Sequence, residues 1–287
     1  MSTILKWAGN KTAVMPELIK HLPDGTRLVE PFAGSCAVMM ATDYHHYLVA
    51  DINPDLINLY KKIALDCEAF ISQARNIFAI ANREVAYYNI RHAFNHSTEI
   101  TDFMKAVYFL YLNRHGYRGL CRYNLSGHFN IPYGNYKNPY FPESEIRAFA
   151  EKAQRATFIC ASYRETLNMV SVGDVVYCDP PYHDTFTRYH TDGFDDDDQY
   201  SLACILMGIS EYAPVTVSNS DTLFTRSIFR EFALTKISAA RSIGVAAGEG
   251  KRATEIIAVR RPKPSPFWMG FDMAAGEDYS IKAEMKA

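Results

Sequence analysis

Short apolar runs and helical periodicities alternate along the first part of the chain. Residues 26–33 (TRLVEPFA) are typical of a buried strand that ends in a turn, and the apolar residues 37–41 suit the first turns of a helix. A second strand at residues 47–50 ends at Asp51 and is followed by helical spacing over residues 54–64. This order of strand, helix, strand and helix predicts the opening of a parallel α/β sheet.

The middle of the chain has a different pattern. From about residue 66 to residue 113 the apolar spacing is helical throughout, and residues 114–142 are then irregular and rich in glycine and proline. Such a long irregular stretch inside a compact domain usually serves function. Strand signals return at residues 157–161, 175–178 and 215–218, and a closing pair at residues 234–238 and 255–259 flanks a glycine-rich loop at residues 244–250.

These patterns predict an α/β sheet that is interrupted by an inserted helical module. We assign residues 1–55 and 143–264 to a discontinuous sheet domain and residues 56–142 to the module. Residues 265–287 are expected to form a weakly ordered tail.

The composition excludes several classes of protein. With 48% hydrophobic and 22% charged residues, the 287-residue chain is an ordinary globular sequence. No stretch reaches the roughly 18 apolar residues of a spanning helix, so we expect no membrane partner. The N-terminus lacks the apolar region of a signal peptide, and the six cysteines lack paired metal-type spacing. We therefore expect a cytoplasmic protein with buried thiols in a reducing compartment.

The net charge of −2 hides a strong asymmetry along the chain. Residues 103–142 contain no Asp or Glu, whereas they hold five Lys or Arg residues, seven Tyr and five Asn. Surfaces that bind nucleic acid are locally basic and rich in groups that stack and hydrogen-bond. A tyrosine-rich core with solvated arginines is the alternative, and composition alone does not decide between the two.

Polar residues follow the first two predicted strands where each of them ends. Gly34 lies just after the first strand, and Asp51 lies directly after the second. Ligands of open α/β sheets bind beyond the carboxyl ends of the strands, where a glycine turn permits close approach and an acid can accept hydrogen bonds from ribose hydroxyls. Without further phosphate-cradling glycines, this pattern suits a nucleoside such as S-adenosylmethionine. A glycine turn followed by a helix-capping acid explains it equally well.

The sequence Asp179-Pro180-Pro181-Tyr182 directly follows another predicted strand. Two prolines cannot continue a central strand, so the chain must turn there. The Asp179 carboxylate and the Pro180 carbonyl could accept the two hydrogens of an aromatic amine and localise its lone pair toward an incoming methyl group, while Tyr182 stacks on the base. The alternative is a surface turn in which Asp179 only caps the backbone.

Six segments of the chain carry a family resemblance: LKWAGNK (5–11), VEPFAG (29–34), LVADIN (48–53), FLYLNRHGYRGLCRYN (109–124), KNPYFPE (137–143) and VVYCDPPY (175–182). In this order, over residues 4–262, the chain resembles Dam-type DNA adenine-N6 methyltransferases. The resemblance implies a Rossmann-like, S-adenosylmethionine-dependent catalytic domain and an inserted helical target-recognition domain with its DNA-contacting loop at residues 114–142. It also implies methylation of adenine N6 in duplex DNA containing GATC by base flipping, with no obligate protein partner.

The resemblance further implies roles for individual residues. The catalytic residues would be Asp179, Pro180 and Tyr182. The cofactor-binding residues would be Trp7, Lys11, Phe32, Gly34, Asp51, Ser162, Tyr163 and Asp179. The DNA-binding residues would be Lys6, Arg91, Tyr117, Arg118, Leu120, Arg122, Asn124, Asn130, Pro132 and Tyr136.

These implied roles agree with the chemistry of the side chains. Tyr117 resembles an aromatic wedge that enters the base stack when adenine leaves it. Arg122 resembles the arginine that reads the guanine edge, and Leu120 and Pro132 suit contact with a thymine methyl group. The acidic run at residues 195–198 is expected to be a solvated loop or helix start, so no metal is implied.

Three positions depart from the family's usual pattern. Cys36 stands where these proteins usually have glycine, Arg118 where they typically have asparagine, and Asn135 where they usually have arginine. These departures bear on base flipping, affinity and processivity rather than on the type of reaction.

Two other functions stay open at this point. A non-catalytic DNA-binding relative could compete for GATC sites, although such a protein has no need for the intact acceptor sequence at residues 179–182. A methyltransferase for another aromatic or amide nitrogen is disfavoured by the acid-free module.

Overall fold

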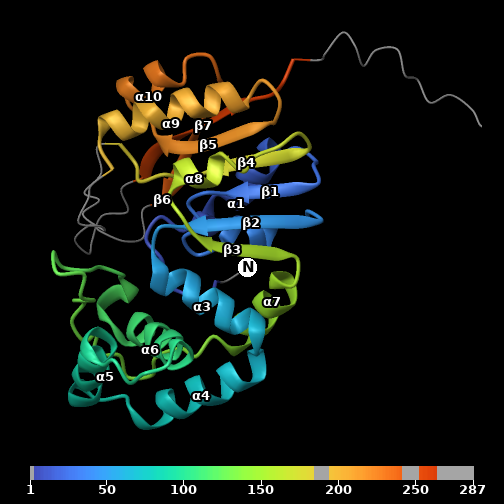
Figure 1. Ribbon diagram of the computed structural model, residues 1–287. Coiled ribbons are helices and arrows are strands. Elements are labelled where there is room, and N and C mark those ends of the chain that lie inside the picture. Colours follow the sequence, from blue (N-terminus) through green and yellow to red (C-terminus); the bar gives the residue numbers. More distant parts are fainter. Residues whose placement is uncertain (1–2, 184–193, 241–251, 264–287) are drawn as a thin grey trace, which may run out of the picture.

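The computed structural model describes residues 3–183, 194–240 and 252–263 of the chain. The strands in these ranges form one seven-stranded sheet in the order β3-β2-β1-β4-β5-β7-β6 (Figure 1). Strands β1 to β5 run parallel to one another, and β7 is antiparallel to both of its neighbours. The strands are Arg27–Glu30 (β1), His46–Asp51 (β2), Ala156–Cys160 (β3), Asp174–Cys178 (β4), Val215–Ser220 (β5), Ala233–Ala240 (β6) and Arg252–Arg260 (β7).

The strand order is that of the Rossmann fold with one antiparallel strand inserted before the last strand. The expected Rossmann-like α/β fold is therefore confirmed. All five residues of β4 and all six of β5 are buried. Strands that are covered on both faces often have continuous apolar runs, as VVYC of β4 does, whereas β5 (VTVSNS) also buries polar side chains.

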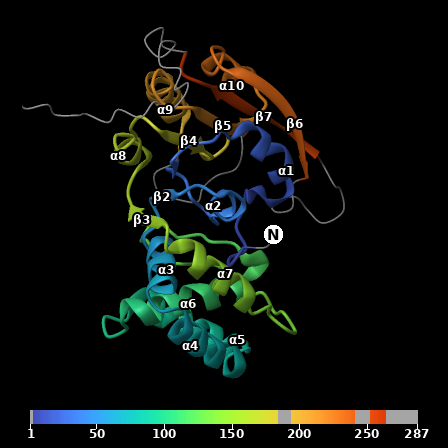
Figure 2. The same ribbon diagram turned by 90° about the vertical axis from the view of Figure 1, so that its right-hand side faces the viewer.

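Helices cover both faces of the sheet. Figure 2 shows α8 and α9 on one side of the strands and α1 and α2 on the other. Adjacent residues of β1 pack into two apolar cores, one on each face of the sheet. Val29 packs in the cluster that contains α8 and α9, and Leu28 packs in the cluster that contains α1 and α2. These helices and their neighbours are η1 (Lys11–Ala13), α1 (Met15–Leu18), η2 (Ile19–His21), α2 (Ala37–Ala41), α7 (Glu143–Ala153), α8 (Tyr163–Leu167), α9 (Asp196–Ile209) and α10 (Leu223–Ile228).

A second group of helices lies beyond the β3 edge of the sheet (Figure 1). It comprises α3 (Pro54–Leu65), α4 (Cys67–Ile80), α5 (Glu84–His96), α6 (Asp102–His115) and the short η3 (Tyr117–Gly119). In α6, the residues from Phe109 to His115 are all buried, polar ones included. A helix that is buried on every side lies in the centre of its bundle, so α6 is the axis around which this group packs.

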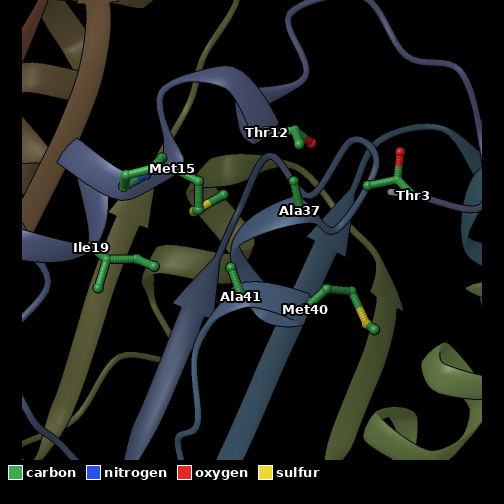
Figure 3. Close-up of a pocket in the computed structure, with 8 residues that line it drawn as sticks. Thr3, Thr12, Met15, Ile19, Ala37, Met40 and Ala41 are labelled. Atoms are coloured by element: carbon green, nitrogen blue, oxygen red, sulfur yellow. The ribbon is translucent and has the colours of Figure 1, made fainter. Parts of the chain in front are cut away.

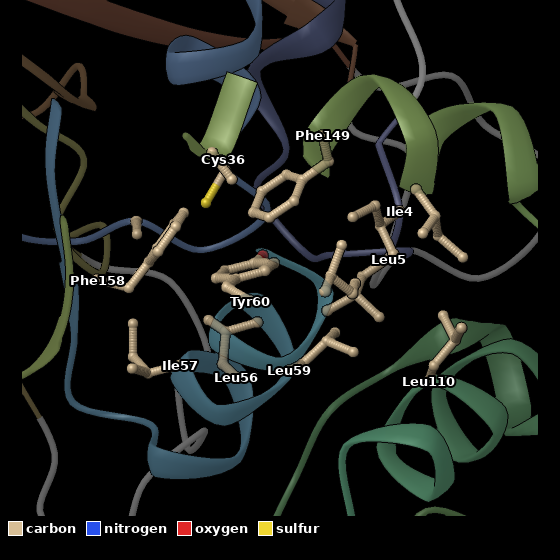
Figure 4. Close-up of a cluster of buried hydrophobic side chains, with 14 of the residues drawn as sticks. Ile4, Leu5, Cys36, Leu56, Ile57, Leu59, Tyr60, Leu110, Phe149 and Phe158 are labelled. Carbon is tan, nitrogen blue, oxygen red and sulfur yellow. The ribbon is translucent and has the colours of Figure 1, made fainter. Parts of the chain in front are cut away.

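Helix α3 joins the two parts of the molecule through one continuous apolar core. Figure 4 shows Leu56 and Tyr60 of α3 between Phe149 and Phe158 on one side and Leu110 of α6 on the other. The Tyr60 ring lies 4.9 Å from Phe149 and 5.7 Å from Phe158. The residues on either side of position 56 therefore share a core, and the division into domains at residues 56 and 142 stays a prediction.

The predicted strands all occur, with ends that differ by a few residues. The predicted helical stretch at residues 66–113 is α4, α5 and α6, and residues 114–142 hold the last two residues of α6, then η3 and two isolated bridges. The expectation of buried thiols is wrong for Cys160 and Cys204, which are exposed. The glycine-rich loop at residues 244–250 and the expected tail at residues 265–287 lie outside the described residues.

Candidate active site and nucleic-acid interface

The predicted cofactor residues gather at one edge of the sheet. Because β1 to β4 are parallel, the segments that follow them emerge on the same side. These segments carry Phe32 and Gly34 after β1, Asp51 at the end of β2, Ser162 and Tyr163 after β3, and Asp179 after β4.

The turn after β1 requires glycine at one position and holds a strained backbone conformation two residues later. Gly34 has φ +47°, and a Cβ atom there would lie 2.8 Å from Nε1 of Trp7, so the indole packs directly on the glycine. Cys36, at the N-cap of α2, has φ 56°, a conformation that costs a non-glycine residue about 1 kcal/mol. The family's usual glycine at this position is explained by this backbone geometry.

Asp51 is oriented by the same turn. Its Oδ2 accepts a hydrogen bond of 3.0 Å from the backbone N–H of Gly34, and its Oδ1 accepts one of 3.0 Å from that of Asn53. These two hydrogen bonds fix the orientation of the carboxylate. Asp51 thus links the glycine turn to the end of β2.

Aromatic rings flank the turn on the other side. Phe32 stacks on Tyr163 with ring centroids 5.7 Å apart and an interplanar angle of 21°, and Phe194 meets both rings edge-on. The Ser162 side chain is engaged in a capping box with Glu165 at the start of α8. The Ser162 side chain therefore caps α8, a role that the sequence did not indicate, and its predicted contact with the cofactor stays a prediction.

Asp179 is held by a buried lysine from the N-terminal segment. Nζ of Lys11 lies 2.7 Å from Asp179 Oδ2 and donates a hydrogen bond of 2.8 Å to the Gly9 carbonyl. The same ammonium group lies 4.7 Å from the centroid of the Tyr182 ring. Within the described residues, Oδ1 of Asp179 has no hydrogen-bond partner. One carboxylate oxygen is therefore anchored, and the other is placed to accept a hydrogen bond from a ligand.

Burial dominates the electrostatics of this site. Removal from water raises the pKa of Asp179 to about 6, even though the Lys11 ammonium acts in the opposite direction. Glu30, at the end of β1, is fully enclosed, and burial raises its pKa to about 8. Oε1 of Glu30 has no partner among the described residues. Glu30 stands in the quoted motif VEPFAG and within residues 26–33, the segment predicted as a buried strand, so its burial agrees with that prediction.

A chain of buried amides clamps the turn that contains Asp179. Nε2 of Gln199 donates to the Pro181 carbonyl at 2.6 Å, and Nδ2 of Asn219 donates to Oε1 of Gln199 at 3.0 Å. Oδ1 of Asn219 in turn accepts from the backbone N–H of His183 at 3.2 Å. Both amide side chains are almost completely buried, so their orientation is fixed. The sequence analysis missed them because α9 and β5 supply them from distant positions.

A cavity of about 220 Å³ lies beside the turn after β1 and is separate from the predicted cofactor site (Figure 3). None of the predicted cofactor-binding residues lines it. Its walls come from the N-terminal segment, η1, α1, η2 and α2, and consist of Thr3, Thr12, Met15, Pro16, Ile19, Ala37, Met40 and Ala41.

The N-terminal segment is fastened to the end of α6. The buried Asn113 side chain accepts a hydrogen bond from the N–H of Lys6 at 2.9 Å and donates to the carbonyls of Lys6 and Gly119. Arg114 is also buried and donates through Nε to the Ile4 carbonyl at 2.9 Å. Arg114 is therefore neither a surface cation nor the solvated arginine of the alternative interpretation, because its guanidinium is buried and binds the backbone.

Four predicted DNA-binding residues form one contiguous surface group. The Lys6 ammonium lies 4.3 Å from the ring centroid of Tyr136, whose hydroxyl accepts a hydrogen bond of 2.8 Å from the backbone N–H of Arg118. The Arg118 guanidinium lies 5.2 Å from the ring of Tyr117, which is 46% exposed. The structure thus brings together cations and stacking rings from the N-terminus and from residues 117–136.

Two of the three departures from the family pattern have unusual backbone angles in this loop. Arg118 has φ 56° and Asn135 has φ 51°. Asparagine tolerates this left-handed region better than most residues, which suits Asn135 and explains the family's usual Asn at position 118.

The predicted guanine-reading residue lies on a short hairpin. Nε of the exposed Arg122 donates to Oδ1 of Asn130 at 2.8 Å, and the backbone N–H of Asn130 donates to the Arg122 carbonyl at 3.0 Å. The side chain of Asn124 accepts hydrogen bonds from the N–H groups of Ser126 and His128. Asn124 and Asn130 therefore shape the hairpin, and their predicted contacts with the DNA backbone stay predictions.

The remaining predicted contacts flank this hairpin. Arg91 of α5 donates to the Ile131 carbonyl at 2.8 Å and lies 4.6 Å from the ring of Tyr88. Leu120 is half-buried and Pro132 is exposed. Arg91 thus braces the backbone next to Pro132, and its predicted contact with DNA stays a prediction.

The acidic run at residues 195–198 forms the start of α9, where the Asp195 side chain caps the helix by accepting from the N–H of Asp198 at 3.0 Å. Within the described residues, no group of three His, Cys, Asp or Glu side chains could hold a metal ion. No helix in the described ranges has the length and apolarity needed to cross a membrane.

The strand order and the predicted residues at the carboxyl edge of the sheet are typical of the class of α/β enzymes that bind a ligand at this edge. The model of the D12 class N6 adenine-specific DNA methyltransferase family matches residues 7–243. The chain belongs to this family and is an adenine-specific DNA methyltransferase, so the expectation of an enzyme rather than a non-catalytic relative is confirmed.

Relatives of similar length agree with this assignment. The chain is 75% identical over 287 residues to the retron Ec67 DNA adenine methylase of Escherichia coli, covering 100% of both chains. It is 46% identical over 265 residues to the DNA adenine methylase of Serratia marcescens, covering 90% of this chain and 97% of the relative. For the DNA adenine methylase of Escherichia coli strain K12 the identity is 44% over 265 residues, with 90% and 95% covered.

The pairing of Lys11 with Asp179 leads to a first prediction. In Lys11→Met the carboxyl loses the positive charge that lowers its pKa, so Asp179 should titrate above the value of about 6 expected in the unchanged protein. Carboxyl-carbon NMR of the cofactor-free protein measures this midpoint. Lys137→Met, at an exposed position outside the site, is the control, and an unchanged Asp179 midpoint in Lys11→Met would contradict the electrostatic role.

Burial of Glu30 leads to a second prediction, on stability. Because burial raises the folded-state pKa from 4.5 to about 8, unfolding releases a proton between these pH values, and stability is lost as the pH rises through them. Glu30→Gln should remove this loss, which is on the order of a few kcal/mol. Urea unfolding at several pH values across this range tests it, with the exposed Glu231→Gln as control. Equal pH slopes for Glu30→Gln and the unchanged protein would refute it.

Proposed function

We propose that this enzyme transfers a methyl group from S-adenosylmethionine to N6 of adenine in duplex GATC, after the adenine has been flipped out of the helix. The observation that carries this proposal is the Asp179 carboxylate. One of its oxygens is anchored by Lys11, and the other is buried without a partner among the described residues. A buried acceptor of this kind suits an amine hydrogen of the target base.

The residues at the carboxyl edge fit the proposed methyl donor. Bound S-adenosylmethionine supplies an electrophilic methyl group on a positively charged sulfur. Asp51 is a carboxylate at the end of β2, a group that accepts hydrogen bonds from ribose hydroxyls, and Gly34 allows close approach to the backbone. Asp51 and Asp179 carry two carboxylates against the single ammonium of Lys11, and this balance favours a cationic ligand when Asp179 is ionised.

The turn of Asp179 to Tyr182 would act on the nitrogen of the flipped base. Asp179 and the Pro180 carbonyl accept the two amine hydrogens, which turns the lone pair toward the methyl group. As the new N6–C bond forms, the S–C bond breaks and its electron pair returns to sulfur. The surplus amine proton passes to the Asp179 carboxylate, whose pKa of about 6 allows it to release the proton to solvent at neutral pH.

The surface around η3 supports recognition of a flipped base and its neighbours. Tyr117 is exposed next to Arg118, which suits a ring that enters the gap in the base stack. Nε of the exposed Arg122 donates to Asn130, and a guanidinium carries two further nitrogens that form a fork. Such a fork matches O6 and N7 of guanine, which is the commonest specific contact in the major groove.

A third prediction tests the carboxylate. Asp179→Asn keeps the shape but replaces one acceptor oxygen with a donor, so single-turnover methyl transfer should fall by roughly two orders of magnitude or more while DNA binding is preserved. Transfer of labelled methyl groups to a GATC duplex measures the rate, and a duplex without GATC tests the site preference. Asp24→Asn, at an exposed position, is the control. Near-normal methyl transfer by Asp179→Asn would contradict the proposed role of the Asp179 carboxylate.

A fourth prediction separates base reading from positioning on the DNA. Arg122→Ala should lower methylation of GATC strongly and lower that of singly altered sites much less, for a loss of roughly 1–3 kcal/mol in discrimination. Arg91→Ala should weaken all sequences about equally and reduce the salt dependence of binding by about one phosphate contact. Methylation rates on GATC and on each altered duplex, measured at two salt concentrations, distinguish base reading from positioning. A common factor for every duplex in Arg122→Ala would show that Arg122 reads no base.

A further inference from the structure

Glu255 lies against the catalytic turn although it belongs to a strand near the other end of the sheet. It is half-buried on β7, where it stands opposite Ser220 of β5 in the antiparallel register. The Tyr182 hydroxyl donates a hydrogen bond of 2.9 Å to Oε2 of Glu255. Glu255 lies beyond the residues that the family model matches, which end at residue 243, and none of the motifs quoted above contains it.

The direction of this hydrogen bond is fixed by its surroundings. Burial together with the nearby carboxylates of Asp179 and Glu255 raises the pKa of the Tyr182 hydroxyl well above its ordinary value, so the hydroxyl stays protonated and donates. A hydrogen bond to a charged acceptor is about twice as strong as one between neutral groups. Glu255 therefore restrains the polar end of the Tyr182 ring.

A second contact restrains the face of the same ring. The Lys11 ammonium lies over it at 4.7 Å, so a planar base that stacks on Tyr182 would use the opposite face. The ring is then fixed by Glu255 at its hydroxyl and by Lys11 on one face. Rotation of the ring would change the position of a stacked base relative to Asp179, and small misplacements of reacting groups lower rates strongly.

We propose that Glu255 is a positioning residue for methyl transfer, which acts by holding the Tyr182 ring in the orientation that places the target base against Asp179. This inference rests on the proposed function, in which Tyr182 stacks on the flipped adenine. Glu255 touches neither base nor donor in this role and acts through the Tyr182 hydroxyl.

The carboxylate of Glu255 also belongs to the set of groups that control Asp179. Its negative charge raises the pKa of Asp179, in the direction opposite to Lys11. Loss of this charge should therefore shift ionisation of Asp179 to lower pH. The titratable groups that face Asp179 are Lys11 of η1, Glu30 of β1, Tyr177 and Cys178 of β4, Tyr182 of the turn and Glu255 of β7.

The experiment compares Glu255→Ala, Glu255→Gln, Tyr182→Phe and the double variant Glu255→Ala/Tyr182→Phe in single-turnover methyl transfer. Glu255→Ala should lower the rate by about tenfold, with cofactor and DNA dissociation constants near those of the unchanged enzyme. At a pH on the plateau, above the acid limb that Asp179 sets, the double variant should be no slower than Tyr182→Phe, because there Glu255 acts through the hydroxyl that Tyr182→Phe has already removed. Glu211→Gln, which removes a surface ion pair with Arg260 on the same strand, is the matched control.

The pH dependence separates positioning from a merely structural role. Glu255→Gln keeps an acceptor oxygen for Tyr182 and removes the charge, so its acid limb of the rate should move to lower pH while the plateau rate falls less than in Glu255→Ala. Loss of a residue with a merely structural role would lower the stability of the protein without moving the acid limb of the pH–rate profile. Since Glu255→Gln preserves shape, it decides the question even where Glu255→Ala does not fold.

Two results would overturn the inference. One is a wild-type rate and pH profile in both Glu255 variants, and the other is a loss in the double variant that equals the full product of the two single losses. All assays use a DNA that the unchanged enzyme methylates at adenine. Failure of the unchanged enzyme on GATC would count against the proposed site specificity alone, so the two failures are distinguishable.

Discussion

The hydrogen bonds between Asn113 and the backbone of Lys6 are the contact on which both halves of the site depend. They fasten the N-terminal segment to the end of α6, and Arg114 adds a second attachment at Ile4. From this anchor the chain carries Lys6 onto the Tyr136 ring and, five residues later, Lys11 onto Asp179. A single short segment therefore connects the predicted DNA surface with the catalytic turn.

Charge and burial together determine how the turn can work. An isolated buried carboxylate would be neutral at physiological pH, and it would then donate a proton rather than accept one from an amine. The ammonium of Lys11 opposes this tendency at Asp179, whereas Glu30, which forms no ion pair with a cation among the described residues, has a pKa of about 8. Two acids at neighbouring strand ends thus differ in protonation at neutral pH because of one lysine.

The sequence predicted those parts of the site that depend on local order along the chain. Gly34, Asp51 and Asp179 could be placed together because each follows a strand of a parallel sheet, and such strands end at a common edge. The fold class and the helical stretch were predicted on the same grounds. The family resemblance supplied the residue roles that no spacing pattern could indicate.

Contacts between distant segments could not be predicted. Gln199 of α9 lies beyond the acidic run at residues 195–198, and Asn219 of β5 lies just past the predicted strand at residues 215–218, yet their amides clamp Pro181 and His183. The burial of Arg114 was missed for the same reason, because a helix that is surrounded on all sides has no amphipathic pattern to reveal its inner face.

The insertion of β7 between β5 and β6 has a consequence for the synthesis of the protein. In the described sheet β6 pairs with β7 alone, so its 8 residues have no place in the sheet until the later strand has left the ribosome. The same strand delivers Glu255 to Tyr182. A nascent chain that has completed Lys11, Asp51 and Asp179 therefore still lacks one contact of the proposed catalytic turn, and translation must pass residue 260 before the enzyme can assemble the proposed site.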